Sequence, residues 1–268
     1  MLRLIAVILL AAFGTAARAT DLPIFDAHIH YSHDARDVLA PAQAIAILRK
    51  AGLRRALVSS SGDEGTQQLL ALAPELILPE LRPYRRRGDL GTWTRDDSVV
   101  AYVEERLKAA KYVSIGEFHV YGADVETPVV KRIVALANEH KLFLHAHSDA
   151  DAVERIFRLD PQARVLWAHA GFEPPGRVRQ MLARYPRLWC DLAFRNDPAS
   201  GGKVAPEWRA LFETFPDRFM VGTDTYTPER WYYVEDHAKW ARGWLKDLPA
   251  DLAERIAFRN GEALFGKD

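Results

Sequence analysis

The sequence of 268 residues contains only one cysteine, Cys190, so the chain cannot form an internal disulfide. Its stability must come from burial of a hydrophobic core, and about 250 residues are enough to build one. Cys190 lies in the apolar stretch Leu188 to Leu192. We therefore expect an inert buried thiol there, rather than a nucleophile.

Long apolar runs are equally scarce, and the longest one stands at the N-terminus. Leu4 to Phe13 is apolar, Arg3 precedes it, and Ala17-Arg18-Ala19 follows it. This three-part pattern is typical of a secretory signal peptide, and we expect cleavage after Ala19. The apolar run is shorter than the roughly 20 residues that a membrane span needs. We therefore expect an exported protein, periplasmic or secreted, without a membrane span.

An excess of charge of either sign is also missing, because 36 basic residues balance 36 acidic ones. Removal of residues 1–19 takes away two arginines, which leaves 34 basic and 36 acidic residues and a net charge of −2. Such a surface has no general attraction for nucleic acid or anionic lipid. We accordingly interpret the basic run from Tyr84 to Arg87 as a solvated patch, and we expect a small-molecule substrate.

Short apolar segments alternate with longer amphipathic segments through residues 20–268, which we expect to form a single domain. Eight segments have the length, the β-branched or aromatic content and the polar boundaries of strands. They are Ile24–Ile29, Arg55–Ser60, Leu76–Leu81, Tyr112–Glu117, Leu142–His145, Val165–Trp167, Leu188–Leu192 and Phe219–Val221. Helical patterns lie between them, at 42–51, 97–111, 128–140, 150–159 and 177–185. Eight βα units in series predict a distorted (β/α)8 barrel, the TIM-barrel fold.

Two further segments complete the predicted organisation. The stretch from Gly201 to Pro206 is expected to be a loop, and 231–246 an additional C-terminal helical segment packed on the barrel. We expect the aromatic residues of that helix to belong to the core. They are Trp231, Tyr232, Tyr233, Trp240 and Trp244.

Histidines gather at the predicted carboxyl ends of the strands, which is where barrels of this kind assemble active sites. His28 and His30 end the first strand, and residues i and i+2 of a strand share one face. The same spacing recurs in the fifth strand at His145 and His147, and His169 follows the sixth strand. One such pair arises easily by chance, but their repetition at strand ends predicts a common site.

Two acidic residues extend this set, because Glu117 ends the fourth strand and Asp224 follows the eighth. Imidazoles combined with carboxylates suit zinc or a similar divalent ion. The predicted metal ligands are His28, His30, Glu117, His145, His169 and Asp224. A carboxylate on the fourth strand can bridge two ions, so one or two are possible. Asp224 is the predicted general base beside a metal-activated water.

Other polar residues near strand ends are weaker candidates for substrate contact. Their side chains can meet a carboxylate or phosphate, although arginines after strands are often only solvated loop residues. These candidates are Arg82, Tyr84, His119, His147 and Arg195. His33 is expected in a loop, His140 at a helix end and His237 on a polar helix face.

The arrangement Asp26-Ala27-His28-Ile29-His30, followed by Glu117, His145, His169 and Asp224, resembles the amidohydrolase superfamily. That resemblance implies metal ligands from a His-x-His pair on strand one, a bridging Lys or Glu on strand four, histidines on strands five and six, and an aspartate on strand eight. It covers nearly all of the predicted mature chain.

Later segments are most similar to the amidohydrolase-related group, which includes carboxylic-acid decarboxylases and dicarboxylate lactonases. The similar segments are Trp167–Gly171, Cys190–Leu192, Phe219–Asp224 and Asn260–Phe265. The stretch Ile115-Gly116-Glu117 instead resembles the TatD-type metallonucleases. Against that subgroup, His147 stands where an arginine is expected, and the eighth strand lacks a Glu-Thr-Asp sequence.

The sequence therefore predicts a metal-dependent hydrolase in which activated water attacks a C–N or C–O bond of an amide, lactone or ester. Phosphoester hydrolysis in a TatD-like site and metal-dependent decarboxylation remain alternatives. A barrel that keeps a metal only for structure or binding is a fourth possibility, and it would show a closed metal shell. Fold kinship cannot name the substrate, because this scaffold supports many chemistries.

Overall fold

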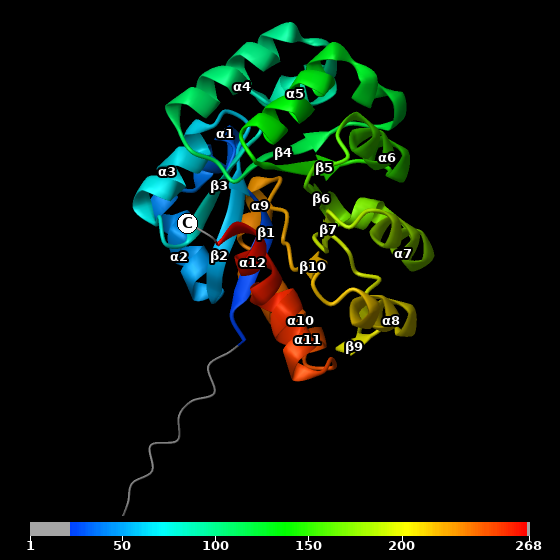
Figure 1. Cartoon of the computed structure of the whole chain (residues 1–268). Coiled ribbons are helices and arrows are strands. Elements are labelled where there is room, and N and C mark those ends of the chain that lie inside the picture. Colours follow the sequence, from blue (N-terminus) through cyan, green and yellow to red (C-terminus); the bar gives the residue numbers. More distant parts are fainter. Residues whose placement is uncertain (1–21, 267–268) are drawn as a thin grey trace, which may run out of the picture.

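The computed structural model describes residues 22–266, so the predicted signal peptide at 1–19 lies outside the described residues. Eight parallel strands form one sheet, with helices on its outer side (Figure 1). In sheet order they are β1 (Ile24–His30), β2 (Leu53–Ser59), β3 (Ile77–Leu81), β4 (Ser114–His119), β5 (Phe143–His147), β6 (Val165–Trp167), β7 (Leu188–Asp191) and β10 (Phe219–Met220). All eight predicted strands are present, and the fold is a (β/α)8 barrel.

Backbone hydrogen bonds between β1 and the segment after β10 close the barrel. The Ala27 N–H donates to the Val221 carbonyl at 2.9 Å, and the Asp224 N–H donates to the His28 carbonyl at 2.7 Å. Each strand of a barrel needs a neighbour on both sides, because an open edge leaves backbone groups unpaired. This closure places the eighth predicted strand directly beside the His-x-His strand.

Asp26 reinforces the closure from inside the structure. Its buried carboxylate accepts hydrogen bonds from the Thr223 backbone N–H at 3.0 Å and from the Thr223 hydroxyl. Burial raises the pKa of Asp26 to about 6, although the hydrogen bonds from Thr223 favour the ionised form. A side chain of β1 thus holds the backbone that carries Asp224.

Helices between successive strands cover the sheet, and they include those that the amphipathic patterns predicted at 42–51, 97–111, 128–140, 150–159 and 177–185. Those after β1 to β7 are α1 (His33–Val38), α2 (Pro41–Lys50), α3 (Glu64–Leu72), α4 (Asp97–Ala109), α5 (Pro128–Glu139), α6 (Ala150–Leu159), α7 (Pro175–Arg184) and α8 (Pro206–Thr214). Asp96, Thr127 and Asp149 cap α4, α5 and α6 through side-chain acceptors. Within residues 22–266, no helix is long and apolar enough to cross a membrane.

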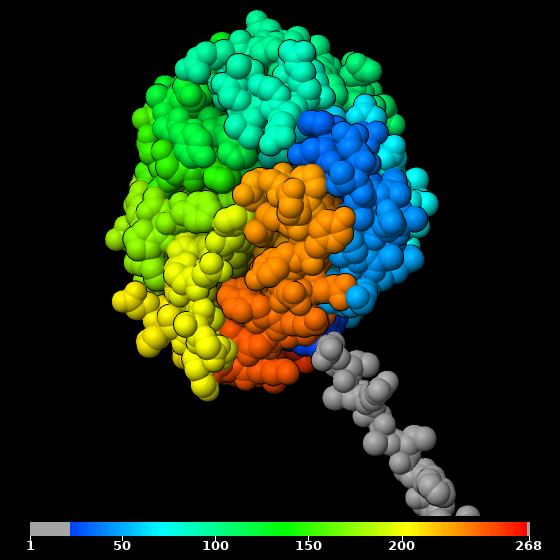
Figure 2. Space-filling model, turned by 180° about the vertical axis from the view of Figure 1, so that it is seen from behind, coloured from blue at the N-terminus to red at the C-terminus, as the bar shows by residue number. Residues whose placement is uncertain are grey.

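The predicted C-terminal helical segment is divided into α9 (Pro228–Trp231) and α10 (Val234–Leu245). Figure 2 shows this segment in orange between the blue region, which holds α2, and the yellow region around residue 200, and α10 packs against α2 and β9. Trp231 and Trp244 are buried as predicted, and Trp240 packs partly buried against the core. Tyr232 and Tyr233 are 69% and 48% exposed, so their assignment to the core was wrong. They form the turn between the helices, which directs both side chains outward.

His237 was also misplaced by the prediction, because it lies on the buried side of α10 with 8% exposure. Its Nδ1 is 3.2 Å from the Thr223 hydroxyl, so it belongs to the polar network behind the barrel closure. The helical phase of α10 could not be read correctly from sequence, because a new helix begins at Val234 after the turn.

The predicted loop at Gly201–Pro206 contains more structure than expected. β8 (Ala199–Ser200) and β9 (Lys203–Val204) pair antiparallel across Gly201 and Gly202, which have φ values of 55° and 75°. Positive φ at both central residues is the geometry of a two-residue hairpin turn, and glycine adopts it without strain. Pro206 then begins α8.

The chain ends by closing the amino-terminal side of the barrel with α11 (Ala250–Glu254), a π-helical turn (Arg255–Arg259) and α12 (Asn260–Phe265). The Phe265 ring lies 4.6 Å from the Phe143 ring and 6.0 Å from the Phe25 ring. The Asn260 side chain donates to the carbonyls of Pro216 and Phe219. The segment Asn260–Phe265 therefore plugs the end of the barrel opposite the predicted site.

Gly261 provides a test of this plug, since a Cβ at that position would lie 2.3 Å from the buried Phe25 ring. We expect Gly261→Ala to destabilise the protein by about 1–3 kcal/mol through overpacking. Gly243→Ala is the matched control, because a Cβ there meets no atom within 4 Å in an exposed turn of α10. It should be neutral or stabilising by up to about 1 kcal/mol. Urea denaturation of both variants measures the difference, and equal effects would contradict the packing argument.

His237 generates a second expectation, for the pH dependence of stability. Burial, together with Arg230, lowers the pKa of His237 to about 4, so the folded state favours the neutral imidazole. The stability that comes from keeping this imidazole neutral is complete above the ordinary pKa near 6.5. It declines below that pH and is lost as the pH falls through 4. Relative to His237→Gln, the free energy of unfolding of the wild-type protein should fall by about 2 kcal/mol between pH 7.5 and pH 4.5. Urea denaturation at both pH values checks this, and parallel profiles would rule it out.

Candidate metal and active site

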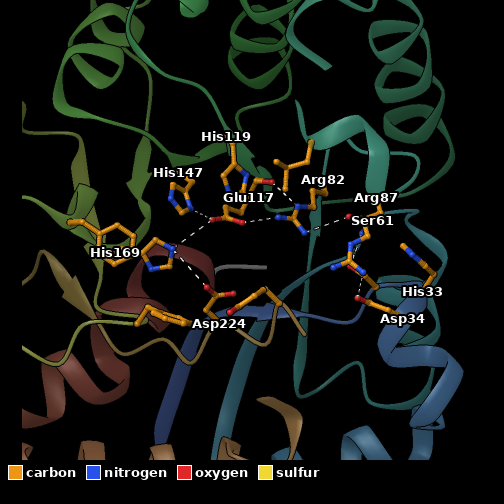
Figure 3. A pocket seen from close by; sticks show the side chains of 15 residues that line it. His33, Asp34, Ser61, Arg82, Arg87, Glu117, His119, His147, His169 and Asp224 are labelled. Carbon is orange, nitrogen blue, oxygen red and sulfur yellow. Dashed lines mark hydrogen bonds and ion pairs between the residues drawn. The ribbon is translucent and has the colours of Figure 1, made fainter. Parts of the chain in front are cut away.

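A cavity of about 370 Å³ opens at the carboxyl ends of the strands. Figure 3 shows its labelled side chains, with His169, Glu117 and Asp224 facing one another across the floor. Arg82, His119 and His147 also line this cavity. His28 and His30 lie buried in the site with 1% exposure each. The barrel thus brings together most of the residues selected from the sequence.

The two histidines of β1 turn the same ring nitrogen into the site. His28 Nδ1 lies 3.3 Å from Asp191 Oδ2, and His30 Nδ1 lies 2.9 Å from the Ser59 hydroxyl. These contacts hold the two Nε2 atoms toward each other at 3.1 Å. Fixing one imidazole nitrogen by an outer partner is how proteins orient a histidine for metal binding.

Carboxylate oxygens of Glu117 and Asp224 surround this nitrogen pair. His30 Nε2 is 3.2 Å from Glu117 Oε2 and 3.4 Å from Asp224 Oδ1, and His28 Nε2 is 3.6 Å and 3.8 Å from Glu117 Oε1 and Asp224 Oδ1. Donor atoms about 2.1 Å from one tetrahedral ion stand about 3.4 Å apart. The observed spacings of 3.1 to 3.8 Å match that expectation.

One carboxylate oxygen of this group contacts imidazoles but makes no hydrogen bond with the described residues. Asp224 Oδ1 is buried and, among the described residues, has no hydrogen-bond partner. A buried carboxylate oxygen without a partner is costly, so it points to a cation or water at this position. The backbone at Asp224 has a positive φ of 58°, and its N–H donates to the His28 carbonyl of β1. This turn sets the direction of the Asp224 side chain.

The electrostatics of the site keep Glu117 ionised. Burial alone would raise its pKa, but His28 and His119, the hydrogen bond with His147 and the nearby His169 imidazole hold the pKa well below its usual range. The pKa of Asp224 is raised by burial and by repulsion from Glu117. Two buried carboxylates that oppose each other in this way favour a shared cation.

His169 faces the same carboxylates from the segment after β6. Its Nδ1 lies 2.8 Å from the Ala193 carbonyl, which leaves Nε2 at 3.7 Å from Glu117 Oε1 and 3.9 Å from Asp224 Oδ2. The backbone turns sharply here, and a Cβ at Gly171 would lie 2.1 Å from the Trp167 ring. The Trp167–Gly171 segment therefore needs its glycine to turn His169 into the site.

The two histidines of β5 take different positions. His145 is fully buried, with Nδ1 3.1 Å from Glu80 Oε1 and Nε2 3.0 Å from Asp191 Oδ2. His147 lines the cavity, and its Nδ1 lies 2.7 Å from Glu117 Oε1. The two ring nitrogens of His145 are thus hydrogen-bonded to Glu80 and Asp191, two carboxylates outside the predicted ligand set.

Asp191, at the end of β7, is the most important site residue that sequence reasoning missed. It is fully buried, contacts the rings of His28 and His145, and accepts a hydrogen bond from the His169 backbone N–H at 3.1 Å. Nearby histidines lower its pKa despite burial. Its place at a strand end, in the segment Cys190–Leu192, was a signal that could have found it.

Arg82 and Tyr84, which were predicted to contact substrate, are hydrogen-bonded to other residues of the site. Arg82 donates from Nε to the Glu117 carbonyl at 2.9 Å and from a terminal nitrogen to Glu117 Oε2 at 2.8 Å. The Tyr84 hydroxyl lies 3.1 Å from His119 Nδ1 and accepts from the His119 N–H at 2.8 Å. Arg82 thus orients Glu117, and Tyr84 orients His119.

Arg195 does not join the other predicted substrate contacts. Its guanidinium pairs with Asp197, donates to the carbonyls of His169 and Glu173, and stacks over Trp208 at 4.6 Å. Among the described cavities it lines a neighbouring one rather than the cavity of the site. It supports the loop that carries His169.

The rim of the cavity contains residues that no motif selected. His33, predicted in a loop, begins α1 and lines the cavity beside Asp34, which pairs with Arg87 at 3.6 Å. Exposed apolar side chains complete the rim, namely Leu90, Phe172, Phe194 and Tyr226. Their convergence depends on loop conformations that periodicity does not reveal.

Solved structures with the same fold have low sequence identity to this chain. An uncharacterized TIM-barrel protein from Bordetella bronchiseptica aligns with a TM-score of 0.60 and 13% identity, covering 92% of this chain and 100% of that one. A probable 2-pyrone-4,6-dicarboxylic acid hydrolase from Acinetobacter baumannii, with citric acid bound, gives 0.61 and 12%, covering 91% and 99%. An adenosine deaminase from Xanthomonas campestris with bound zinc gives 0.58 and 14%, covering 91% and 66%.

Among curated proteins, none matches this chain. The family model described as Amidohydrolase matches residues 25–267, which is nearly the whole of the described barrel. This match agrees with the strand-end positions of the histidines and carboxylates. The chain therefore belongs to the amidohydrolase family, a membership that identifies it as an enzyme.

Proposed function

We propose that this enzyme is a divalent-metal-dependent hydrolase that cleaves a C–N or C–O bond at a carbonyl carbon of a small molecule. The observation that carries the proposal is Asp224 Oδ1, a buried oxygen without a hydrogen-bond partner among the described residues, 3.4 and 3.8 Å from the Nε2 atoms of His30 and His28. That arrangement leaves a place for a cation between the Asp224 carboxylate and the two imidazoles.

The donor set supports zinc or a similar ion. With an ion bound, the imidazoles of His28 and His30 would supply nitrogen donors, and Glu117 and Asp224 would supply carboxylate oxygens, at spacings suited to one ion. A divalent ion bound there would act as a Lewis acid and make a water molecule acidic enough to react near neutral pH. We assign these four residues to the ion, with His169 facing the open side of the group.

Asp224 is the residue that we propose to move the proton. Its Oδ1 lies beside the nitrogen pair and its Oδ2 is 3.9 Å from His169 Nε2, so one carboxylate faces both the proposed ion site and the cavity. As the water oxygen bonds to the carbonyl carbon, Asp224 accepts the proton. It then gives that proton to the nitrogen or oxygen of the leaving group as the C–N or C–O bond breaks.

The surroundings of the group support a small organic substrate. The cavity of about 370 Å³ has apolar side chains at its rim and charged groups at its floor, the usual composition of a small-molecule site. Arg82 holds Glu117 in place through two hydrogen bonds, so the position of this carboxylate does not depend on a bound substrate. The predicted signal peptide, if cleaved, would place the reaction outside the cytoplasm.

The first test concerns metal content and activity together. We expect purified protein to bind zinc or manganese, and chelation to abolish hydrolysis of ester, lactone or amide substrates. His30→Ala should lose the ion, because it removes a donor that lies 3.1 to 3.4 Å from three others. Asp224→Asn should lower kcat about a hundredfold or more, since it removes the proton acceptor.

His140→Ala is the control for these variants, because His140 is exposed at the end of α5 and remote from the cavity. It should keep both metal and activity. Full turnover after complete metal removal would contradict the proposal. Hydrolysis of phosphodiesters alone would instead favour the TatD-like alternative, and release of carbon dioxide without hydrolysis would favour decarboxylation.

A further inference from the structure

The backbone at Asp224 is held from two sides in a conformation that side chains seldom adopt. Its φ of 58° lies in the left-handed region, where a residue with a Cβ stays only when its surroundings fix it. On one side, the Asp224 N–H donates to the His28 carbonyl of β1 at 2.7 Å. The contacts on the other side come from a single arginine of α9.

That arginine is Arg230, which supplies two donor nitrogens. Its Nη2 donates to the Thr223 carbonyl at 2.5 Å, and its Nε donates to the Asp224 carbonyl. A planar guanidinium can hold two neighbouring acceptors in this way because its N–H groups form a rigid fork. Together with the bond to His28, these contacts give both backbone groups of Asp224 a partner from another element.

The position of Arg230 indicates that it acts through Asp224 and not by touching a substrate. Among the described cavities, it lines the neighbouring one, of about 390 Å³, rather than the cavity of the site. Its guanidinium lies 4.2 Å from the centroid of the Phe194 ring, and Phe194 lines both cavities. Arg230 therefore stands behind the rim, outside the cavity in which a substrate would bind.

The same short helix also contacts the first strand. Trp231, the neighbour of Arg230, is buried and donates from Nε1 to the His30 carbonyl at 3.0 Å. α9 thus holds the backbone at both His30 and Asp224, whose side chains lie 3.4 Å apart in the site. Because Trp231 fixes α9 on the barrel, Arg230 has a defined position relative to Asp224.

We propose that Arg230 is a positioning residue, whose guanidinium holds the Thr223 and Asp224 carbonyls and thereby directs the Asp224 carboxylate toward the ion site. This inference rests on the proposed function, in which Asp224 binds the ion and moves the proton. No motif pointed to Arg230, because it lies beyond the last strand end. A lysine would keep the positive charge but lacks the fork, so the two residues separate orientation from simple attraction.

Chemical rescue of Arg230→Ala tests this role. On the ester, lactone or amide that the wild-type protein hydrolyses, kcat of this variant should fall about 10- to 100-fold with KM nearly unchanged, because Asp224 loses its orientation while the cavity keeps its lining. Free guanidinium ion can enter through the neighbouring cavity. At a concentration too low to unfold the protein, it should restore kcat severalfold, whereas methylammonium at the same concentration should not.

Two further variants complete the comparison. Arg230→Lys should lose about tenfold in kcat, since it keeps the charge without the fork, and it serves if urea denaturation shows that Arg230→Ala does not fold. Arg132→Ala is the matched control, because Arg132 is a partly exposed arginine of α5 that pairs with Glu104 and Glu139. It should keep wild-type activity and give no response to guanidinium.

The affinity for Zn²⁺ adds a readout that does not depend on turnover. Metal-free protein is titrated with Zn²⁺ in competition with a chelator. Arg230→Ala should bind Zn²⁺ about tenfold more weakly than the wild-type protein, since the groups that orient a metal ligand contribute to affinity. Guanidinium should recover part of this loss, and Arg132→Ala should bind as the wild-type protein does.

The outcomes separate this inference from the proposed function. A wild-type protein that neither binds Zn²⁺ nor hydrolyses these substrates would overturn the proposed function and this inference with it. In an active wild-type background, undiminished kcat in Arg230→Ala or Arg230→Lys would overturn the positioning role alone. A higher KM with unchanged kcat, or a loss of kcat that guanidinium does not restore better than methylammonium, would do the same. Rescue of kcat and of Zn²⁺ affinity by guanidinium supports it.

Discussion

The hydrogen bonds that close the barrel between β1 and the segment after β10 are the constraint on which the site depends. The Asp224 N–H donates to the His28 carbonyl at 2.7 Å, and Asp26 binds the backbone and hydroxyl of Thr223. These contacts join the first strand of the sheet to the segment that follows the last one. Without them, the carboxylate of Asp224 would not stand within 4 Å of the imidazoles of β1.

Beneath the cavity, buried charges are arranged so that each has a partner. His145 lies between Glu80 and Asp191, whose carboxylates raise its pKa to about 9 against the effect of burial. Asp191 in turn contacts His28. Buried ions are tolerated only when such partners compensate their desolvation. This paired layer supports the floor of the site, and it leaves Asp224 Oδ1 as the buried carboxylate oxygen without a hydrogen bond among the described residues.

Several parts of the fold and site were predictable because they depend on local periodicity. The eight strands and the helices between them follow from alternation of apolar segments, and each predicted strand is present. The placement of His28, His30 and Glu117 at strand ends follows from the same pattern. The packing of α10 did not follow, because the turn at Tyr232 and Tyr233 shifted the face on which His237 lies.

The sequence by itself determined the barrel, the strand ends that carry histidines and carboxylates, and the family resemblance, because these depend on spacing along the chain. Only the tertiary structure decided between His145 and His147 as the β5 residue in the cavity. Both lie on one face of the strand, and the sequence pattern has no measure of depth. Glu80 and Asp191, from other strands, occupy the nitrogens of His145, whereas His147 reaches Glu117. Contacts between distant segments made that choice.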